Sequence, residues 1–315
     1  MKTARTRIGT LLVPTDFSIS SRKALEYASA LLQEFDGELH LVHVHVPDYS
    51  YSVPALLSQP PLLTAGEIER YHRAELQKLC REYASSDATP PCHAPIGSPF
   101  DEICKVAREI SADYIVIATR GLTGVKHLLL GSTAERVVRH APCPVLVVRQ
   151  REREFASPKK AGLKIERIVV PVDFSECSRA GVEEAIAFAK ATGARLALIH
   201  AYQLLPYVPC EHMATYEHMP SPDVIEDAAD AQLEEFIATI DFRGVERETA
   251  VRCGRAADAI RDFANETYAD LIVTSTHGHT GLAHVLIGSV AEHVVRYAPC
   301  PVLVIPQREQ LAKQS

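Results

Sequence analysis

The chain has 315 residues, of which 47% are hydrophobic and 23% charged, and its formal net charge is -7. These values are typical of a globular protein with one large domain or two domains of ordinary size. Lysine and arginine are scattered rather than gathered on one element, which argues against a nucleic-acid or anionic-membrane partner and favours a small ligand.

Membrane insertion and export are not expected from the sequence. No stretch approaches the roughly 20 apolar residues of a membrane-spanning helix, and the apolar run near the N-terminus is too short for a signal peptide. The 8 cysteines include no C-x-x-C pair, and in a chain of this length they favour reduced, mostly buried thiols. We therefore expect a cytoplasmic protein.

Apolar runs alternate with helical periodicity along the first half of the chain. We expect strands over 8–13, 39–46, 92–96, 114–119 and 145–148, and helices over 24–35, 64–85, 99–110 and 132–140, with Gly37 ending the first helix. Strands that read as continuous apolar runs between helices indicate a parallel sheet covered on both faces. The expected fold is α/β, with a doubly wound domain of five parallel strands.

The second half of the chain repeats the first at a spacing of 157 positions, which relates Asp16 to Asp173. Between 121–148 and 278–305, 19 of 28 aligned residues are identical. A period this long exceeds that of solenoid repeats, so each unit should be a complete domain with its own core. We assign domain 1 to residues 1–150, a solvated linker to 151–164 and domain 2 to 165–315.

A carboxylate follows the first strand of each unit, at Asp16 and Asp173. Ligands of an open α/β sheet bind beyond the carboxyl ends of the strands, where an Asp can accept hydrogen bonds from ribose hydroxyls. The same side chain could instead start the following helix through an Asx turn or cap. The sequence leaves both interpretations open.

A loop with several glycines follows the fourth strand of each unit and ends in Gly131-Ser132 or Gly288-Ser289. Glycines allow close approach of the backbone to a ligand, and the free N–H groups at a helix N-terminus favour phosphate. Both serines also fit the S-x-x-E capping box, so helix capping is the structural alternative to phosphate binding.

These motifs resemble the universal stress protein family, whose nucleotide-binding members carry G-x2-G-x9-G-[ST] after strand four. In both units nine residues separate the second and third glycines, whereas Ala118 and Ser275 replace the first. The Pro-x-Asp-x-Ser start and the Ala-Pro-Cys-Pro-Val-Leu-Val end match as well, so the resemblance covers nearly the whole chain, twice.

The resemblance implies an adenine nucleotide alpha-hydrolase-like, Rossmann-like fold with an adenosine-type pocket. Backbone near the second strand would meet adenine, the strand-one Asp would meet ribose, and the glycine loop would hold phosphates. The implied ligand is ATP or AMP, accompanied by Mg²⁺, and the implied role is stress signalling with an unidentified protein partner. The implied nucleotide-binding residues are Pro14, Thr15, Asp16, Val44, Ala118, Gly121, Gly131, Ser132, Thr133, Val172, Asp173, Ala201, Ser275, Gly278, Gly288, Ser289 and Val290.

The family's final strand commonly pairs with that of a second domain. The resemblance therefore implies that Val145–Val148 and Val302–Ile305 pair within the chain as an intramolecular pseudo-dimer, which would cover two exposed edges. A homodimer is the further assembly that it allows.

Other functional classes are less well supported by the residues. The sequence has no P-loop, no G-x-G-x-x-G after the first strand and no G-x-S-x-G elbow, so we expect at most slow ATP hydrolysis. A nucleotide-free interaction module is the second alternative. Metal sensing through Cys210, His212 and His218 is the third, but their spacing matches no standard zinc pattern, and an exposed polar loop is favoured.

Four further residues are interpreted as structural. His43 and His200 end apolar strands and are expected to have satisfied hydrogen bonds. Cys143 and Cys300 are expected to pack as small buried hydrophobic side chains at the start of the last strand of each unit.

Overall fold

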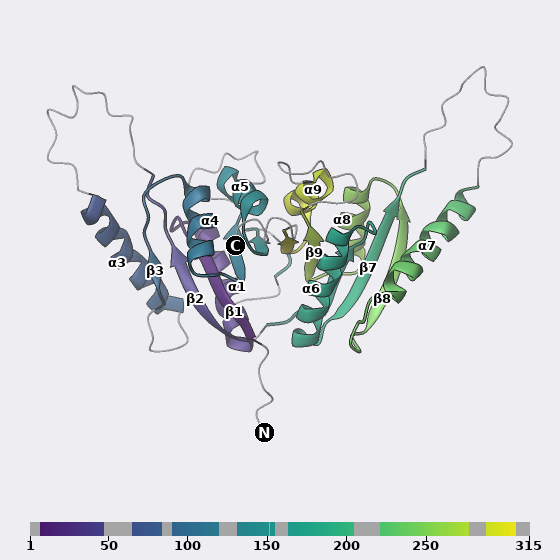
Figure 1. Ribbon diagram of the computed structural model, residues 1–315, viewed down its shortest axis with the longest axis horizontal. Coiled ribbons are helices and arrows are strands. Elements are labelled where there is room, and N and C mark those ends of the chain that lie inside the picture. Colours follow the sequence, from purple (N-terminus) through teal and green to yellow (C-terminus); the bar gives the residue numbers. More distant parts are fainter. Residues whose placement is uncertain are drawn as a thin grey trace, which may run out of the picture. The chain divides into compact units, whose positions relative to one another are not determined.

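The computed structural model describes residues 7–46, 65–83, 90–119, 131–150, 152–154, 163–204, 221–276 and 288–306 (Figure 1). The chain divides into two compact units. One consists of Met1–Lys164 with Pro306–Ser315, and the other of Ile165–Ile305. Each unit has its own set of strands and helices.

The first unit alternates strands and helices in nearly the expected order. Its elements are β1 (Arg7–Pro14), α1 (Ile19–Glu34), β2 (Asp36–Val42), α3 (Ala65–Tyr83), β3 (Cys92–His93), α4 (Pro99–Glu109), β4 (Tyr114–Ala118), α5 (Ser132–His140) and β5 (Val145–Val148). The strands are parallel and follow the order β3-β2-β1-β4-β5. This arrangement confirms the expected α/β class and the five-stranded parallel sheet.

The second unit has the same plan. Its elements are β6 (Arg167–Pro171), α6 (Glu176–Thr192), β7 (Arg195–Tyr202), α7 (Pro222–Ala238), β8 (Arg247–Cys253), α8 (Ala256–Glu266), β9 (Leu271–Ser275), α9 (Ser289–Tyr297) and β10 (Val302–Ile305). Its parallel strands follow the order β8-β7-β6-β9-β10. Both units therefore share one topology, in which the first strand lies between the second and the fourth.

The helices of the first unit form two pairs. Helix α1 contacts α3, and α4 contacts α5 and lies beside it in Figure 1. Because parallel crossovers are right-handed and the strand order reverses next to β1, the two pairs cover opposite faces of the sheet. The sheet is thus buried on both sides, which explains why its strands read as uninterrupted apolar runs.

The core consists of these apolar strands and the helix residues that face them. All four residues of β5 and all four of β10 are buried. Cys143 and Cys300 are buried as well, which confirms their interpretation as packed side chains. Within the described part of the chain, no helix combines the length and the apolar character that a membrane crossing requires.

The first helix ends differently from the expectation. Gly37 does not stop α1, which ends at Glu34 with Phe35 as an extended C-cap, and Gly37 lies inside β2 opposite Gly9. A Cβ at Gly37 would approach the carbonyl oxygen of Gly9 to 2.5 Å, so glycine is required here for close strand packing. In the second unit, by contrast, Gly193 is a left-handed C-cap with φ 74°.

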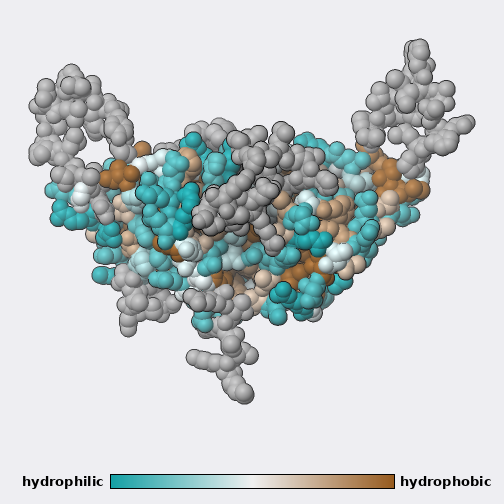
Figure 2. Space-filling view, viewed as in Figure 1, coloured by the Kyte–Doolittle hydropathy of each residue, from teal (hydrophilic) through white to brown (hydrophobic). Residues whose placement is uncertain are grey.

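The visible surface of the described residues is mainly hydrophilic, with a few small hydrophobic patches (Figure 2). The large hydrophobic side chains that are exposed come from separate elements; examples are Ile19, Val224 and Tyr268. Scattered exposure of this kind is ordinary for a folded protein.

Candidate functional site

In each unit the strand order reverses beside the first strand. The register pairs Leu11 of β1 with Leu39 of β2 on one side and with Tyr114 of β4 on the other. The carboxyl ends of these three strands therefore meet at one edge of the sheet, which is the ligand-binding position of open α/β folds.

Most of the expected site residues lie at this edge. In the first unit Thr15 and Asp16 follow β1, Val44 follows β2, Ala118 ends β4, and Gly131 precedes α5. In the second unit the corresponding positions hold Val172, Asp173, Ala201, Ser275 and Gly288. Gly121 and Gly278 lie outside the described residues.

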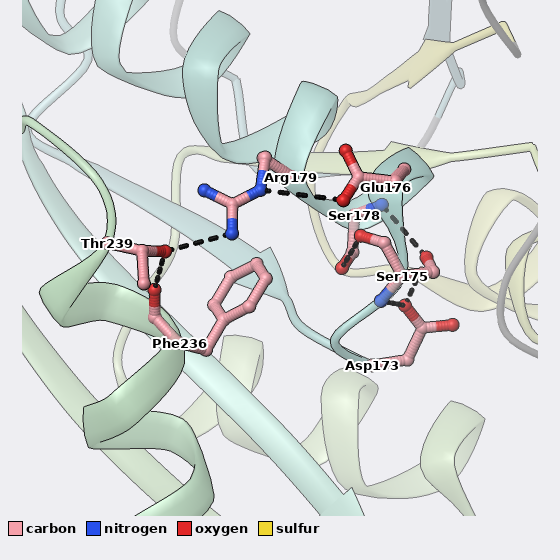
Figure 3. Close-up of polar contacts among 7 residues, drawn as sticks. All are labelled: Asp173, Ser175, Glu176, Ser178, Arg179, Phe236 and Thr239. Atoms are coloured by element: carbon pink, nitrogen blue, oxygen red, sulfur yellow. Dashed lines mark hydrogen bonds and ion pairs between the residues drawn. The ribbon is translucent and has the colours of Figure 1, made fainter.

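Each strand-one aspartate forms an Asx turn. Oδ1 of Asp16 accepts a hydrogen bond from the backbone N–H of Ser18 at 3.1 Å. Oδ1 of Asp173 accepts one from the N–H of Ser175 at 3.1 Å and another from its hydroxyl at 2.6 Å (Figure 3). The turn interpretation is thus confirmed, and it fixes one carboxylate oxygen while leaving each aspartate side chain half-buried at the sheet edge.

The residue after each aspartate has a backbone conformation that is rare for a side chain of its size. Phe17 and Phe174 have φ values of 63° and 65°, and such a conformation costs of order 1 kcal/mol. Its occurrence at the same place in both units indicates that the turn geometry is built into the fold.

A histidine supports this turn in both units. Nδ1 of His43 donates to the carbonyl oxygen of Thr15 at 2.8 Å, and Nδ1 of His200 donates to that of Val172 at 2.8 Å. The imidazoles contact Phe17 and Phe174, with ring centroids 4.6 and 4.4 Å apart. Their interpretation as structural histidines with satisfied hydrogen bonds is therefore confirmed.

The surroundings of this histidine differ between the units. In the first unit the ring of His72 in α3 lies 4.3 Å from that of His43, tilted by 39°, and its Nε2 lies 3.3 Å from Nδ1 of His45. Burial lowers the pKa of His43, although its hydrogen bond to Thr15 raises it. Burial also lowers the pKa of His72, as do the neighbouring His43 and His45. The neutral forms of His43 and His72 are therefore favoured, and the cluster of three imidazoles was not expected from the sequence.

The second unit has a phenyl ring beside the turn where the first has the imidazole cluster. Phe236 of α7 contacts Phe174 edge to face, with centroids 5.8 Å apart. The guanidinium of Arg179 lies over the Phe236 ring at 5.0 Å, and its Nη2 donates to the hydroxyl of Thr239 at 2.8 Å (Figure 3). The two candidate sites therefore share a turn and differ in the rings that pack around it.

The helix that follows the fourth strand starts without a side-chain cap. The N-caps are Gly131 and Gly288, and neither α5 nor α9 has a side-chain cap hydrogen bond. The expected S-x-x-E capping box is absent from these helices, because glycine and not serine is the N-cap; Glu135 and Glu292 form ion pairs with Arg139 and Arg296, one turn further on. Ser132 and Ser289 occupy the first helical position instead and are exposed.

The backbone N–H groups at these helix starts have two roles: the first forms a hydrogen bond within the fold, and the next ones are available to a ligand. The N–H of Gly131 donates to the carbonyl of Thr119 at 2.5 Å, and that of Gly288 to Thr276 at 2.8 Å. The next N–H groups belong to the first turn of the helix, where no intrahelical acceptor exists. Together with the positive end of the helix dipole, they suit an anion.

The different caps lead to a matched prediction for the second unit. Ser175→Ala is expected to lower its unfolding free energy by about 1 kcal/mol, because the Ser175 hydroxyl accepts from the N–H of Ser178 at 3.1 Å. Ser289→Ala should change it by less than about 0.5 kcal/mol. Urea unfolding with hydrogen exchange of α6 and α9 peptides measures both, and equal losses would contradict Gly288 as the N-cap.

The described residues contain no cluster of three or more His, Cys, Asp or Glu side chains that could hold a metal ion. The low-ranking metal candidates Cys210, His212 and His218 lie outside the described residues.

The model of the universal stress protein family matches residues 8–149 and, a second time, residues 164–306. Universal stress protein G of Escherichia coli O157:H7 is 36% identical over 149 residues, which cover 44% of this chain and 98% of that protein. A universal stress protein of Mycobacterium tuberculosis H37Rv is 26% identical over 247 residues, covering 74% of this chain and 75% of its own length.

The fold also resembles a solved structure over its whole length. The crystal structure of a universal stress protein from Archaeoglobus fulgidus covers 97% of this chain and 98% of its own, with a TM-score of 0.64 and 23% identity. Since the two family matches span nearly the whole chain, one over each half, the protein belongs to the universal stress protein family and carries two such domains in tandem.

Proposed function

We propose that each unit binds an adenine nucleotide, ATP or AMP, at the carboxyl edge of its sheet. The observation that carries the proposal is the pairing, in both units, of a fixed strand-one aspartate with a helix start that has no side-chain cap. A carboxylate suits ribose hydroxyls and a helix N-terminus suits phosphate, so the two features fit the ribose and the phosphates of one nucleotide.

The phosphates would bind at the starts of α5 and α9. The exposed hydroxyls of Ser132 and Ser289 are not used as caps and can therefore donate to a phosphate oxygen. The next residue is Thr133 in the first unit and Val290 in the second, so the first unit offers one more hydroxyl. Mg²⁺ would accompany the phosphates of ATP. We expect the first unit to bind more tightly.

The adenine would meet backbone groups after the second strand. In the first unit the N–H groups of His43 and His45 donate to the carbonyls of His93 and Pro95, on the β3 side. Because backbone groups alternate along an extended chain, the N–H and C=O of Val44 point toward the β1 side. The last bond between β1 and β2 joins Thr15 N to Val42 O at 2.8 Å, so Val44 lies beyond it.

Ala201 is the equivalent residue of the second unit, although it still belongs to β7. The carbonyl of the following residue, Tyr202, accepts from Gly254 on the β8 side. By the same alternation, the backbone of Ala201 points toward the end of β6, where Val172 N donates to Ile199 O. In both units, therefore, a backbone N–H group and a carbonyl group after or near the end of the second strand are available to an adenine base.

We further propose that the protein reports nucleotide occupancy in the stress response, in the cytoplasm, through a protein partner yet to be identified. Membership of the universal stress protein family supports this role. The pairing of the last strands of the two units with each other remains a prediction.

Calorimetric titration with ATP and AMP tests the binding. We expect two sites, and Gly131→Val or Gly288→Val should each weaken one of them at least about tenfold, because the added side chain blocks approach to the helix start. Valine suits the extended backbone at Gly131, with φ -73° and ψ 146°, so folding should be retained. Gly66→Ala, whose Cβ would meet nothing within 4 Å, is the control.

Several results would contradict the proposal. Absence of heat, of a thermal shift with millimolar ATP and of co-purifying nucleotide would together favour the nucleotide-free interaction module. Unchanged affinity in both valine variants would exclude the helix starts as phosphate sites. Phosphate release from the same samples measures hydrolysis, for which we expect at most slow turnover.

A further inference from the structure

Two buried cysteines of the first unit face each other across α3 and β3. The Sγ atoms of Cys80 and Cys92 are 3.5 Å apart, and both thiols are free. A disulfide has a sulfur–sulfur distance of about 2.05 Å. An approach of roughly 1.5 Å, within the reach of side-chain rotation and a small backbone shift, would therefore join them.

The polar surroundings distinguish the two thiols. Sγ of Cys92 donates to the carbonyl of Pro90 at 3.3 Å, and Nη1 of Arg73 donates to the carbonyl of Cys92 at 3.0 Å. The hydrogen bond from Cys80 lowers the pKa of Cys92, and the positive charge of Arg73 lowers it further, against burial. The same hydrogen bond and burial raise the pKa of Cys80. Cys92 is thus the sulfur that ionises first.

Strand β3, which carries Cys92, is the shortest strand of the first unit. β3 has only two residues, lies at the edge of the sheet and pairs with β2 through Leu41 and Val42. Its opposite edge has no strand neighbour within the described sheet of this unit. Backbone hydrogen bonds from Leu41, His43 and His45 to the carbonyls of Pro91, His93 and Pro95 hold this segment, so rotation of the two cysteine side chains must supply most of the approach.

We propose that Cys80 and Cys92 form a dithiol that a peroxide oxidises to a disulfide, tethering α3 to β3. The Cys92 thiolate attacks one oxygen of hydrogen peroxide, the O–O bond breaks, and the departing hydroxide takes up a proton to become water. The Cys80 sulfur then attacks the Cys92 sulfenic acid, its proton leaves with the hydroxyl as a second water, and the disulfide remains. Two thiols are oxidised and one peroxide is reduced.

The second unit provides a natural comparison, since it has no thiols at these positions. At the repeat spacing of 157, Ile237 of α7 corresponds to Cys80, and Thr249 of β8 corresponds to Cys92. Helix α3 also carries His72 of the imidazole cluster. Oxidation would therefore restrain the helix that contributes to the candidate site of the first unit only.

Peptide mapping of the full chain after treatment with hydrogen peroxide tests the proposal. Free thiols are alkylated, the protein is digested and the peptides are weighed. We expect a linked Cys80–Cys92 peptide, about 2 Da lighter than the sum of its reduced parts, that disappears with dithiothreitol. Cys104, Cys143 and Cys300 are buried free thiols as well, and we expect them to remain alkylatable after denaturation.

Two variants assign the roles of the sulfurs. In Cys80→Ala, the sulfenic acid of Cys92 should persist and react with dimedone, whereas Cys92→Ala should leave Cys80 reduced. Alkylation of Cys80 and Cys92 to the same extent before and after peroxide would overturn the proposal, as would linkage of either to another cysteine. The peptide map of the unmodified chain decides this even if a variant fails to fold.

Discussion

Gly9→Ala is expected to lower the unfolding free energy of the first unit by about 3 kcal/mol. Gly9 has φ 82°, a conformation that costs a residue with a Cβ about 1–2 kcal/mol. An added Cβ would also approach Cγ of Asp113 to 2.7 Å, far inside van der Waals contact. The carboxylate would have to move and give up its 2.7 Å hydrogen bond from the N–H of Thr10, worth about another 1–2 kcal/mol.

Gly193→Ala separates the two contributions. Gly193 has a similar φ of 74°, but a Cβ there would meet nothing within 4 Å, so only the conformational cost of about 1 kcal/mol is expected. Urea unfolding of each variant, with hydrogen exchange of β1 and β6 peptides to resolve the units, measures both. A loss in Gly9→Ala no larger than in Gly193→Ala would show that Asp113 can move without cost.

The role of Asp113 could not be read from the sequence, although the repeat contains a signal for it. Asp270 lies 157 positions later, and its Oδ2 accepts from the N–H groups of Glu166 and Arg167 at 2.8 and 3.0 Å. Both aspartates thus bind the backbone of the first strand of their unit, at Thr10 within β1 and at the start of β6. A carboxylate just before a buried strand has several possible partners. Its actual partner is a backbone N–H group more than 100 residues away in the sequence, which becomes a neighbour only in the folded chain.

The fold was predictable where burial alone decides it. Strands such as Val145–Val148 are buried on both faces, so the apolar run itself marks their bounds. Gly37 was assigned wrongly because a glycine after a helix resembles a stop signal, whereas here it allows close approach to Gly9. The periodicity of a single segment carries no information on the distance between Gly37 and Gly9, which belong to different strands.

The candidate site was predictable as far as it depends on strand ends. Asp16 follows β1, and Gly131 precedes α5. The alternation of strands and helices in each repeat was sufficient to predict both positions. The capping box was wrong by one residue, because Gly131 takes the N-cap and moves Ser132 into the helix. The imidazole cluster needs His72 to meet His43 across separate elements, which no local pattern reports.

Glu152→Gln is expected to stabilise the first unit at pH 8 and to leave it unchanged near pH 4.5. The Glu152 side chain is fully buried, and burial raises its pKa from 4.5 to about 7, although the nearby charges of Lys23 and Arg149 lower it. Between these values the folded state binds more protons than the unfolded state, so stability is lost as the pH rises. The variant lacks the charge, and we expect a gain of about 1–3 kcal/mol at pH 8.

Glu154→Gln is the matched control for this pH dependence. Glu154 pairs with the same ammonium group of Lys23, at 3.0 Å against 3.8 Å for Glu152, but its side chain is 48% exposed. Solvent screening makes such a pair worth less than about 1 kcal/mol, so this variant should be no more stable than the parent at either pH. Urea unfolding at pH 4.5, 6 and 8 gives the comparison.

The two outcomes distinguish burial from ion pairing as the dominant contribution at this position. If Glu152→Gln is destabilised at pH 8, the attraction of Lys23 and Arg149 exceeds the cost of burying the charge. If it is stabilised, burial dominates, because Lys23 also donates to the carbonyl of Arg149 at 2.6 Å and pairs with Glu154. The ammonium group of Lys23 is shared with the Arg149 carbonyl and with Glu154. We therefore expect Lys23 to compensate the buried charge of Glu152 only in part.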